Sequence, residues 1–186
     1  MIRSLTKQDT SQAMTLWLEG NLDAHPFIPA AYWHDHIPEV TEQLAQAECY
    51  GWFDGARLLG FVGMQDAYLA GLFVARQARS QGVGTALLDH IKAIRPTFML
   101  QVYRENQRAA AFYRREGLTV TAEGTDPDTG AAELTMTWHP PTPSESGGCA
   151  CLIAPSAAKS SVRSQMGSPL TPMDAAVQGN PEDAVG

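Results

Sequence analysis

The order of elements expected along this chain predicts an α/β fold, in which a mixed sheet carries helices on both faces. Three apolar runs within residues 49–74 are separated by turn signals, as consecutive strands are. A glycine-bearing loop then leads into an amphipathic helix, whose apolar residues Leu87, Leu88 and Ile91 follow helical spacing. At 186 residues, the chain is long enough for one sizeable domain and hardly for two.

The first 47 residues are predicted to be mainly helical. One helix begins at Asp9 or Thr10, because such side chains cap helix N-termini, and Gly20 is placed near its end. The aromatic-rich residues 21–38 are expected to be irregular. The other elements expected here are a strand at 2–5 and a helix at 39–47.

From residue 48 onward, turn and cap signals mark the element boundaries. Asp54-Gly55 is a strong hairpin signal, and Pro96 ends the helix that follows the glycine loop. Asn106 caps a second helix, after which Gly117 fits the C′ position. The expected elements are strands at 49–53, 57–64, 68–74 and 98–103, the loop and helix at 77–94, a helix at 107–116, and two closing strands at Val120 and at 134–138.

The loop after the strand at 68–74 is predicted to hold a polyphosphate. Its backbone N–H groups converge at the positive end of a helix, and Arg76 and Arg79 add charge beside them. It is not a Walker A loop, which needs Gly-Lys-Ser/Thr, and Leu87 stands where a dinucleotide fingerprint needs a small residue. The pattern Arg/Gln-x-x-Gly-x-Gly/Ala fits, as Arg79-Ser-Gln-Gly82-Val-Gly84.

This loop resembles the pyrophosphate loop of the GNAT superfamily of N-acetyltransferases, which bind acetyl-coenzyme A. A second signature, running from Asn106 through Phe112-Tyr113 to Gly117, is similar to the family's Asn-x-x-Ala-x-x-Phe-Tyr…Gly-Phe element, with Leu118 replacing the final aromatic residue. The resemblance covers about residues 1–139 and implies a mostly antiparallel sheet with one splayed parallel strand pair. The chain looks like the small bacterial members implicated in protein lysine acetylation.

The resemblance implies a set of cofactor contacts and one catalytic group. Tyr113 is the expected general acid, because a phenol can donate a proton to the departing thiolate. Asn106 is placed to bond the pantetheine amide, and Gly71 fits a bulge in the strand beside the pantetheine arm. The expected contacts with coenzyme A are Leu72, Phe73, Val74, Arg79, Gln81, Gly82, Val83, Gly84, Thr85, Asn106 and Tyr113.

The acceptor side is less clearly marked in the sequence. A base should help the amine to lose its proton, and Asp66, Glu48 and His25 are the candidates. Aromatic side chains could line a channel for an aliphatic amine, with cation–π attraction for its charged form, or could simply pack the helices. The residues expected at the acceptor are His25, Phe27, Tyr32, Trp33 and Tyr68.

Three activities fit these residues. The first is an acetyl-CoA-dependent N-acetyltransferase that acts on a protein lysine or an N-terminal amine. The second is the same chemistry on a small amine such as an antibiotic, a polyamine or an amino acid. The third is a regulator that binds acyl-CoA without turnover, which the presence of both Asn106 and Tyr113 disfavours. Direct attack of the amine, with no metal, is the expected route.

The net charge of −7 hides an asymmetry along the chain. Residues 1–75 hold three Lys/Arg against nine Asp/Glu, whereas residues 76–115 hold eight against two. The basic segment suits an anionic cofactor and the acidic one a cationic substrate, although ordinary surface charge is an alternative for any single residue. Overall acidity disfavours nucleic-acid binding.

The bulk sequence also predicts where the protein works and where its domain ends. No signal peptide or 18-residue apolar run is recognisable, so we expect a cytoplasmic monomer or homodimer without membrane association. Residues 1–139 are the expected acetyltransferase domain. Residues 140–186 hold seven Pro, five Gly and seven Ser but no aromatic residue, and are expected to form a disordered tail.

Overall fold

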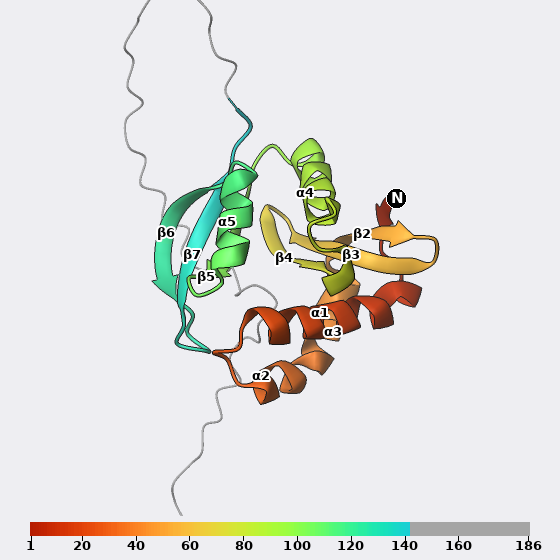
Figure 1. Ribbon diagram of the computed structural model, residues 1–186, viewed down its shortest axis with the longest axis horizontal. Coiled ribbons are helices and arrows are strands. Elements are labelled where there is room, and N and C mark those ends of the chain that lie inside the picture. The colour runs from red at the N-terminus through yellow and green to blue at the C-terminus, as the bar shows by residue number, and fades with distance from the viewer. Residues whose placement is uncertain (142–186) are drawn as a thin grey trace, which may run out of the picture.

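The computed structural model describes residues 1–141, which form a seven-stranded sheet with helices packed against it (Figure 1). The strand order is β1-β2-β3-β4-β5-β7-β6, and neighbouring strands are antiparallel except for the parallel pair β4 and β5. The strands are β1 (Ile2–Ser4), β2 (Glu48–Asp54), β3 (Arg57–Gln65), β4 (Tyr68–Val74), β5 (Phe98–Tyr103), β6 (Thr119–Thr125) and β7 (Ala132–Trp138). The mixed, mostly antiparallel sheet predicted from the sequence is confirmed.

Helices lie on both sides of the first half of this sheet, with α1 to α3 on one side and α4 on the other (Figure 1). A fifth helix, α5, packs on β5. The α-helices are α1 (Thr10–Ala24), α2 (Ala30–Asp35), α3 (Ile37–Gln46), α4 (Val83–Ile94) and α5 (Gln107–Arg115), and the 3₁₀ turns are η1 (Lys7–Asp9) and η2 (Arg76–Ala78). Within residues 1–141, no helix is both long and apolar enough to cross a membrane.

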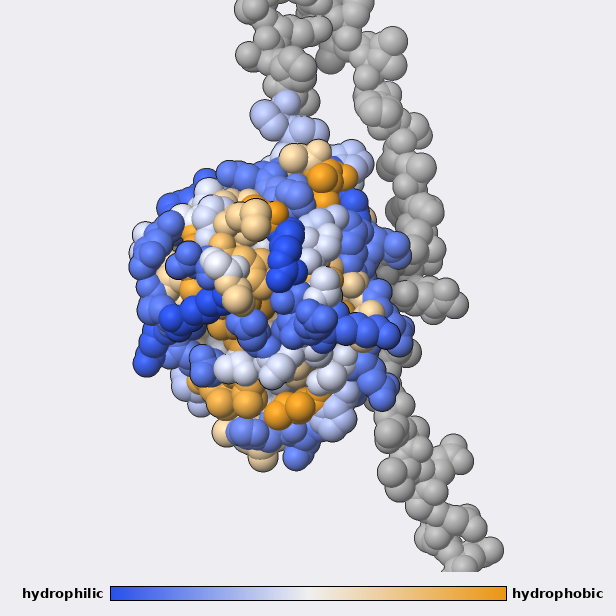
Figure 2. Space-filling view, turned by 90° about the vertical axis from the view of Figure 1, so that its right-hand side faces the viewer, coloured by the Kyte–Doolittle hydropathy of each residue, from blue (hydrophilic) through white to orange (hydrophobic). Residues whose placement is uncertain are grey.

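The core lies between the sheet and its covering helices. Leu87, Leu88 and Ile91 are fully buried, which confirms the apolar face expected for this helix. Burying an aliphatic side chain of this size stabilises the fold by about 1.5–3 kcal/mol. On the face shown in Figure 2, hydrophilic residues predominate and apolar ones form small separate patches.

The parallel strands β4 and β5 separate almost as soon as they meet. Their register contains a single pair, Tyr68 with Met99, after which β4 continues toward Val74 without its neighbour. A shift in the pairing of β3 with β4 leaves Ala70 without a partner, so the bulge is at Ala70, one residue before the expected Gly71. The splayed pair is therefore present, and it leaves one edge of β4 open.

Two expectations for the N-terminal half are wrong. The first helix does not end near Gly20 but continues to Ala24. Glycine is needed at this position because a Cβ there would lie only 2.9 Å from Cδ1 of Phe73. Asp9 precedes the helix but makes no side-chain cap; its carboxylate accepts hydrogen bonds from Arg3 and Thr6 instead.

Residues 21–38 are also more regular than expected. They contain the end of α1, all of α2 and the start of α3. The helix α2 buries Trp33, whose ring meets the edge of Trp17 on α1 at a centroid distance of 5.9 Å. Burial of a large aromatic side chain stabilises this short helix, although its sequence shows no helical periodicity.

The other expected elements are present, and most boundaries agree to within two residues. Asn106 caps α5, because its Oδ1 accepts a hydrogen bond from the Ala109 backbone N–H at 3.1 Å. Gly117 follows the helix with φ of +89°, as a C′ glycine does. The strands β6 and β7 are longer than predicted. The prediction of a disordered tail falls almost entirely on residues 142–186, outside the described part of the chain.

Candidate active site

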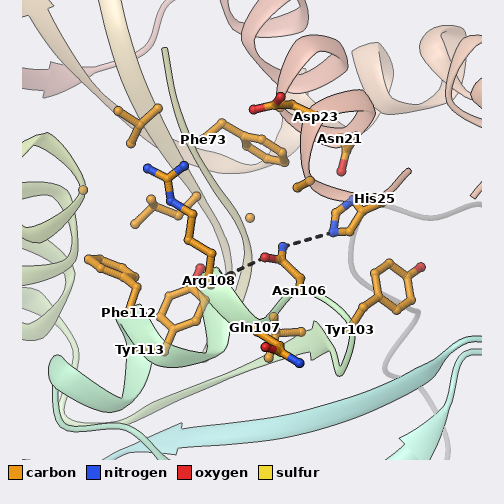
Figure 3. Close-up of a pocket in the computed structure, with 18 of the residues that line it drawn as sticks. Asn21, Asp23, His25, Phe73, Tyr103, Asn106, Gln107, Arg108, Phe112 and Tyr113 are labelled. Carbon is orange, nitrogen blue, oxygen red and sulfur yellow. Dashed lines mark hydrogen bonds between the residues drawn. The ribbon is translucent and has the colours of Figure 1, made fainter. Parts of the chain in front are cut away.

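A cleft of about 970 Å³ opens where β4 and β5 separate. Its walls come from the end of α1, the second half of β4, the loop before α4, the end of β5 and the start of α5 (Figure 3). Of the residues expected to contact the cofactor, those that line it are Leu72, Phe73, Val74, Arg79, Gly82, Gly84, Thr85, Asn106 and Tyr113. Most of the residues expected at the cofactor therefore lie along one cleft.

The loop before α4 ends in a glycine that no other residue would replace without strain. Gly82 is the N-cap of α4 with φ of +83°, and its carbonyl accepts the Ala86 N–H at 2.9 Å. A Cβ at this position would have nothing within 4 Å, so the backbone here faces open space. The first N–H groups of a helix have no partner within it and can hydrogen-bond an anion. The loop thus fits a phosphate group.

Both arginines of this loop are paired with one carboxylate of α1. Asp23 accepts a hydrogen bond from Arg76 at 2.8 Å and another from Arg79. The Arg79 side chain also donates through Nε to the Val74 carbonyl at 3.2 Å. The hydrogen bond from Arg79 is the main cause that holds the pKa of Asp23 below its usual range. Arg79 therefore borders the cleft while its guanidinium is tied to α1, and Arg76, which does not line the cleft, is tied to the same carboxylate.

Three residues expected at the pyrophosphate turn their side chains elsewhere. Gln81 is exposed and its Nε2 donates to the Gln77 carbonyl at 2.6 Å, while Val83 is buried in the core. The Thr85 hydroxyl donates to Oε1 of Glu116 at 2.8 Å. Any contact of these three residues with a phosphate would therefore come from their backbone N–H groups.

The open edge of β4 forms the central wall of the cleft. Leu72, Phe73 and Val74 line it, and beyond Tyr68 this strand has no pairing with β5. The Phe73 ring stacks on Phe61 at a centroid distance of 5.2 Å, which fixes the strand against the core. Unpaired backbone groups on such an edge can bind an extended ligand as an added strand would.

Asn106 and His25 join the two sides of the cleft. Besides capping α5, Asn106 places its Nδ2 at 3.3 Å from Nε2 of His25, at the end of α1 (Figure 3). Burial lowers the pKa of His25 to about 4, so its imidazole is neutral near pH 7. A neutral ring with so low a pKa is a weak base toward an ammonium group. His25 thus suits a structural place in the wall better than proton abstraction.

Tyr113 is buried on α5 beside the cleft. Burial raises the pKa of its phenol well above the usual value of about 10. Its hydroxyl therefore stays protonated over the physiological range and can donate a proton. A protonated hydroxyl is what the general-acid role expected from the sequence requires, while the raised pKa makes the phenol a weaker acid than a free one.

Aromatic side chains gather at the other end of the cleft. The His25 ring stacks on Trp33 at 5.4 Å between centroids and meets Tyr103 and Phe27 edge-on at 5.0 and 5.7 Å. Tyr32 is not among the lining residues; it packs behind Trp33. The structure therefore brings together three of the five residues expected at the acceptor.

Tyr68, the fifth of these, lies at the point where the strands part. Its hydroxyl donates to Oε1 of Gln101 on β5 at 3.1 Å. Two candidate bases, Glu48 and Asp66, are not brought to the cleft but line a separate small depression at the other end of these strands. Glu48 accepts a hydrogen bond from Tyr50 there and pairs with Arg95.

Four carboxylates line the cleft, and none of them was predicted from the sequence: Asp23, Glu105, Asp126 and Glu133. Asp126 follows β6 and is only 3 % exposed, and its Oδ2 accepts a hydrogen bond from the Tyr103 hydroxyl. Glu133 on β7 accepts a hydrogen bond from Nε2 of Gln101 at 2.5 Å. The alternation of side chains along a strand indicates which residues of β7 share a face with Glu133. It does not indicate that this face lies at the cleft, and the residue was therefore missed.

Comparison with known proteins agrees with this geometry. The model of the "Acetyltransferase (GNAT) family" matches residues 12–118. Peptidyl-lysine N-acetyltransferase YiaC of Escherichia coli K12 is 37% identical over 140 residues, which cover 74% of this chain and 96% of that protein. Peptidyl-lysine N-acetyltransferase YjaB of Salmonella typhimurium LT2 is 25% identical over 130 residues, covering 69% and 90% respectively.

Solved structures show the same fold at lower identity. The solution structure of apo YjaB from Escherichia coli has a TM-score of 0.66 at 21% identity, and covers 74% of this chain and 95% of that one. A GCN5-related N-acetyltransferase from Rhodopseudomonas palustris has a TM-score of 0.64 at 16% identity, with coverage of 74% and 93%. Together with the family match and the similarity to YiaC, the cleft leads to one conclusion: this chain belongs to the GNAT family of acetyltransferases.

Proposed function

We propose that this enzyme transfers an acetyl group from acetyl-CoA to lysine side chains of proteins. The observation that supports this most is its 37% identity with a peptidyl-lysine N-acetyltransferase over 96% of that protein's length. The described part of this chain adds a cleft with separate ends for an anionic cofactor and a cationic acceptor.

The cofactor end of the cleft suits coenzyme A. The N-terminus of α4 offers backbone N–H groups to the pyrophosphate, and the open edge of β4 offers main-chain hydrogen bonds to the pantetheine arm. Gly82 leaves room for the phosphates to approach the backbone. The thioester would then lie near Tyr113, whose hydroxyl can protonate the departing thiolate.

The acceptor end suits an ammonium group on an aliphatic chain. Trp33 and Phe27 offer aromatic surface to the methylene groups and to the charge. Asp126 and Glu133 place negative charge in the same part of the cleft. A lysine side chain carries a cation at the end of four methylene groups, so it matches both features.

A small amine is the second candidate acceptor. The observation in its favour is the acidic pair itself, because Asp126 is almost completely buried and Glu133 is half-buried. Acids this far inside a cleft can be reached by a free polyamine or an amino acid as readily as by a lysine side chain.

The test measures binding and turnover separately. Acetyl-CoA is titrated calorimetrically into the protein, and free thiol is then followed with lysine peptides whose N-terminus is blocked, with peptides that carry a free N-terminus and no lysine, and with small amines. We expect acetyl-CoA to bind and the blocked lysine peptides to release thiol fastest. Release with small amines alone would refute the protein acceptor, and a lack of binding would refute the use of acetyl-CoA.

A further inference from the structure

Glu133 lines the cleft beside Tyr103, in a gap left by its neighbours on the sheet. On the sheet it is paired with Tyr103 of β5 on one side and with Gly124 of β6 on the other. A Cβ at Gly124 would lie 3.5 Å from Oε1 of Glu133, so this glycine places no side chain beside the carboxylate. The side chain is half-buried and lines the cleft.

A chain of hydrogen bonds fixes this carboxylate relative to the fork between β4 and β5. The Tyr68 hydroxyl donates to Oε1 of Gln101 at 3.1 Å, which leaves the amide nitrogen of Gln101 to donate to Glu133. Tyr68 stands at the single paired position of the two strands. The network therefore runs from the point where the strands part to the carboxylate, and holds it in one orientation.

Asp126, a buried acid of the same wall, already accepts hydrogen bonds through both of its carboxylate oxygens. The Oδ2 of Asp126 accepts the hydrogen bond from Tyr103, and its Oδ1 accepts the backbone N–H groups of Asp128 and Thr129 at 2.8 and 3.2 Å. The carboxylate oxygens of Asp126 thus organise their own turn and hold the Tyr103 hydroxyl.

The surroundings of Glu133 make its carboxylate a better proton acceptor. Burial first, and then the charge of Asp126, raise the pKa of Glu133, while the hydrogen bond from Gln101 acts in the other direction. Tyr68 and Tyr103 face it from β4 and β5, respectively, as neutral hydroxyls, since burial raises the pKa of both. The nearby cation Arg104 is paired with Glu123 on β6.

We propose that Glu133 is the proton acceptor for the amine that attacks the thioester, directly or through one water molecule. The inference rests on the proposed acetyl transfer. The ammonium gives one proton to the Glu133 carboxylate, and the nitrogen lone pair then forms the N–C bond. The C–S electron pair leaves with sulfur, which takes the Tyr113 proton, and the second amine proton restores the Tyr113 hydroxyl. Glu133 returns its proton to solvent, so the products are the amide, the free thiol and one proton.

The test is the variant Glu133→Gln, which keeps the shape and loses the base. We expect unchanged acetyl-CoA affinity and a fall in kcat/KM of about 10²-fold at pH 7, since general-base catalysis typically contributes 10²–10⁴-fold. The defect should shrink about tenfold for each pH unit and disappear near pH 9, because the fraction of lysine amine that is already deprotonated, with a pKa of about 10.4, rises tenfold per unit. It should also be smaller with an acceptor whose amine has a lower pKa.

The control is Glu42→Gln, which removes an exposed carboxylate of α3 outside the cleft and should leave rate and pH profile unchanged. A Glu133→Gln enzyme with wild-type kcat/KM would overturn the proposal, as would a defect equal at every pH, which indicates a structural role. A loss of acetyl-CoA affinity above about tenfold would contradict it too.

Each variant is measured on whichever primary amine the wild type acetylates fastest. A wild type that ignores lysine peptides therefore refutes the proposed acceptor, while the assignment of Glu133 is still decided on a small amine.

Discussion

The two halves of the cleft are built in different ways. The cofactor half, named for the ligand that we propose for it, consists of β4, the loop 75–82, α4 and the start of α5, and comes from one stretch of about fifty residues. The acceptor half combines the end of α1 and α2 with the end of β5 and the turn between β6 and β7. The first half is assembled by local sequence, whereas the second depends on how distant segments pack.

The halves also differ in the groups that they offer to ligands. The cofactor half presents mainly backbone groups, at the open edge of β4 and at the N-terminus of α4. It therefore needs a glycine at the start of α4 and an unpaired strand edge, rather than particular side chains. The acceptor half presents side chains, with aromatic rings around His25 and carboxylates at Asp126 and Glu133. Changes in the first should therefore affect cofactor binding, and changes in the second should affect the acceptor and the proton.

The largest effect is expected for Gly82→Glu in the cofactor half. The new residue must adopt φ of +83° and points a carboxylate into the space expected for phosphate, so acetyl-CoA binding should fall below detection in calorimetry. Gly55→Glu is a matched control, because Gly55 has φ of +57°, equally open surroundings and a position in the β2–β3 turn. Wild-type affinity of Gly82→Glu would break the assignment of this loop.

Tyr113→Phe tests the border between the halves. Acetyl-CoA should bind with wild-type affinity, while the rate of thiol release falls by about 10²-fold, since the phenol that protonates the thiolate is lost. Tyr50→Phe removes a hydroxyl that contacts Glu48 outside the cleft and should leave the rate unchanged. An equal rate in both variants would remove Tyr113 from the chemistry.

The pH dependence of stability tests the packing of the acceptor half. Burial lowers the pKa of His25 to about 4, whereas the unfolded value is about 6.5. The neutral ring therefore contributes fully to the free energy of unfolding above pH 6.5, and this contribution is lost as the pH falls from 6.5 to about 4. Chemical denaturation at several pH values gives the slope of the free energy of unfolding against pH. This slope should be smaller in His25→Phe than in the wild type by up to about 1.4 kcal/mol per pH unit. His34→Phe, on the exposed surface of α2, should keep the wild-type slope; identical slopes in all three proteins would contradict a buried neutral His25.

The smallest effect is expected where the halves are tied together. Asp23→Asn removes the charge that pairs with Arg76 and Arg79, so both guanidinium groups become available to phosphate. Partly exposed ion pairs are worth about 0–1 kcal/mol, so acetyl-CoA affinity should rise by no more than about fivefold. Glu19→Gln, an exposed acid on the same helix, should leave the affinity unchanged. A weaker affinity in Asp23→Asn would mean that Asp23 positions the arginines for binding.

Sequence reasoning predicted the cofactor half well because its signals are local. The loop from Arg79 to Gly84 and the cap at Asn106 each specify backbone geometry within a few residues, and both were found as expected. The side chain of Arg79 was harder to place, because its partner Asp23 lies 56 residues earlier in the chain. The local sequence pattern therefore predicted the position of Arg79 in the loop but not the partner of its guanidinium group.

Apart from the missing cap at Asp9, the main failures involve contacts between segments far apart in the chain. Gly20 looked like the end of a helix, but the ring of Phe73 on β4 determines why glycine is there. Glu48 and Asp66 were plausible bases by composition, yet the strands place them at the far end from the cleft. Glu133 was not considered, because its relation to Gln101 depends on the pairing of β7 with β5.

The sequence by itself determined the fold class, the family signatures and the cofactor end of the cleft, because helix caps, turn glycines and strand alternation act over a few residues. Only the tertiary structure decided which acids reach the cleft, which arginines are paired, and where α1 ends. Those outcomes depend on strand register and on the packing of helices against the sheet. A shift of one residue in register turns a side chain to the opposite face, and no local signal records which face meets the cleft.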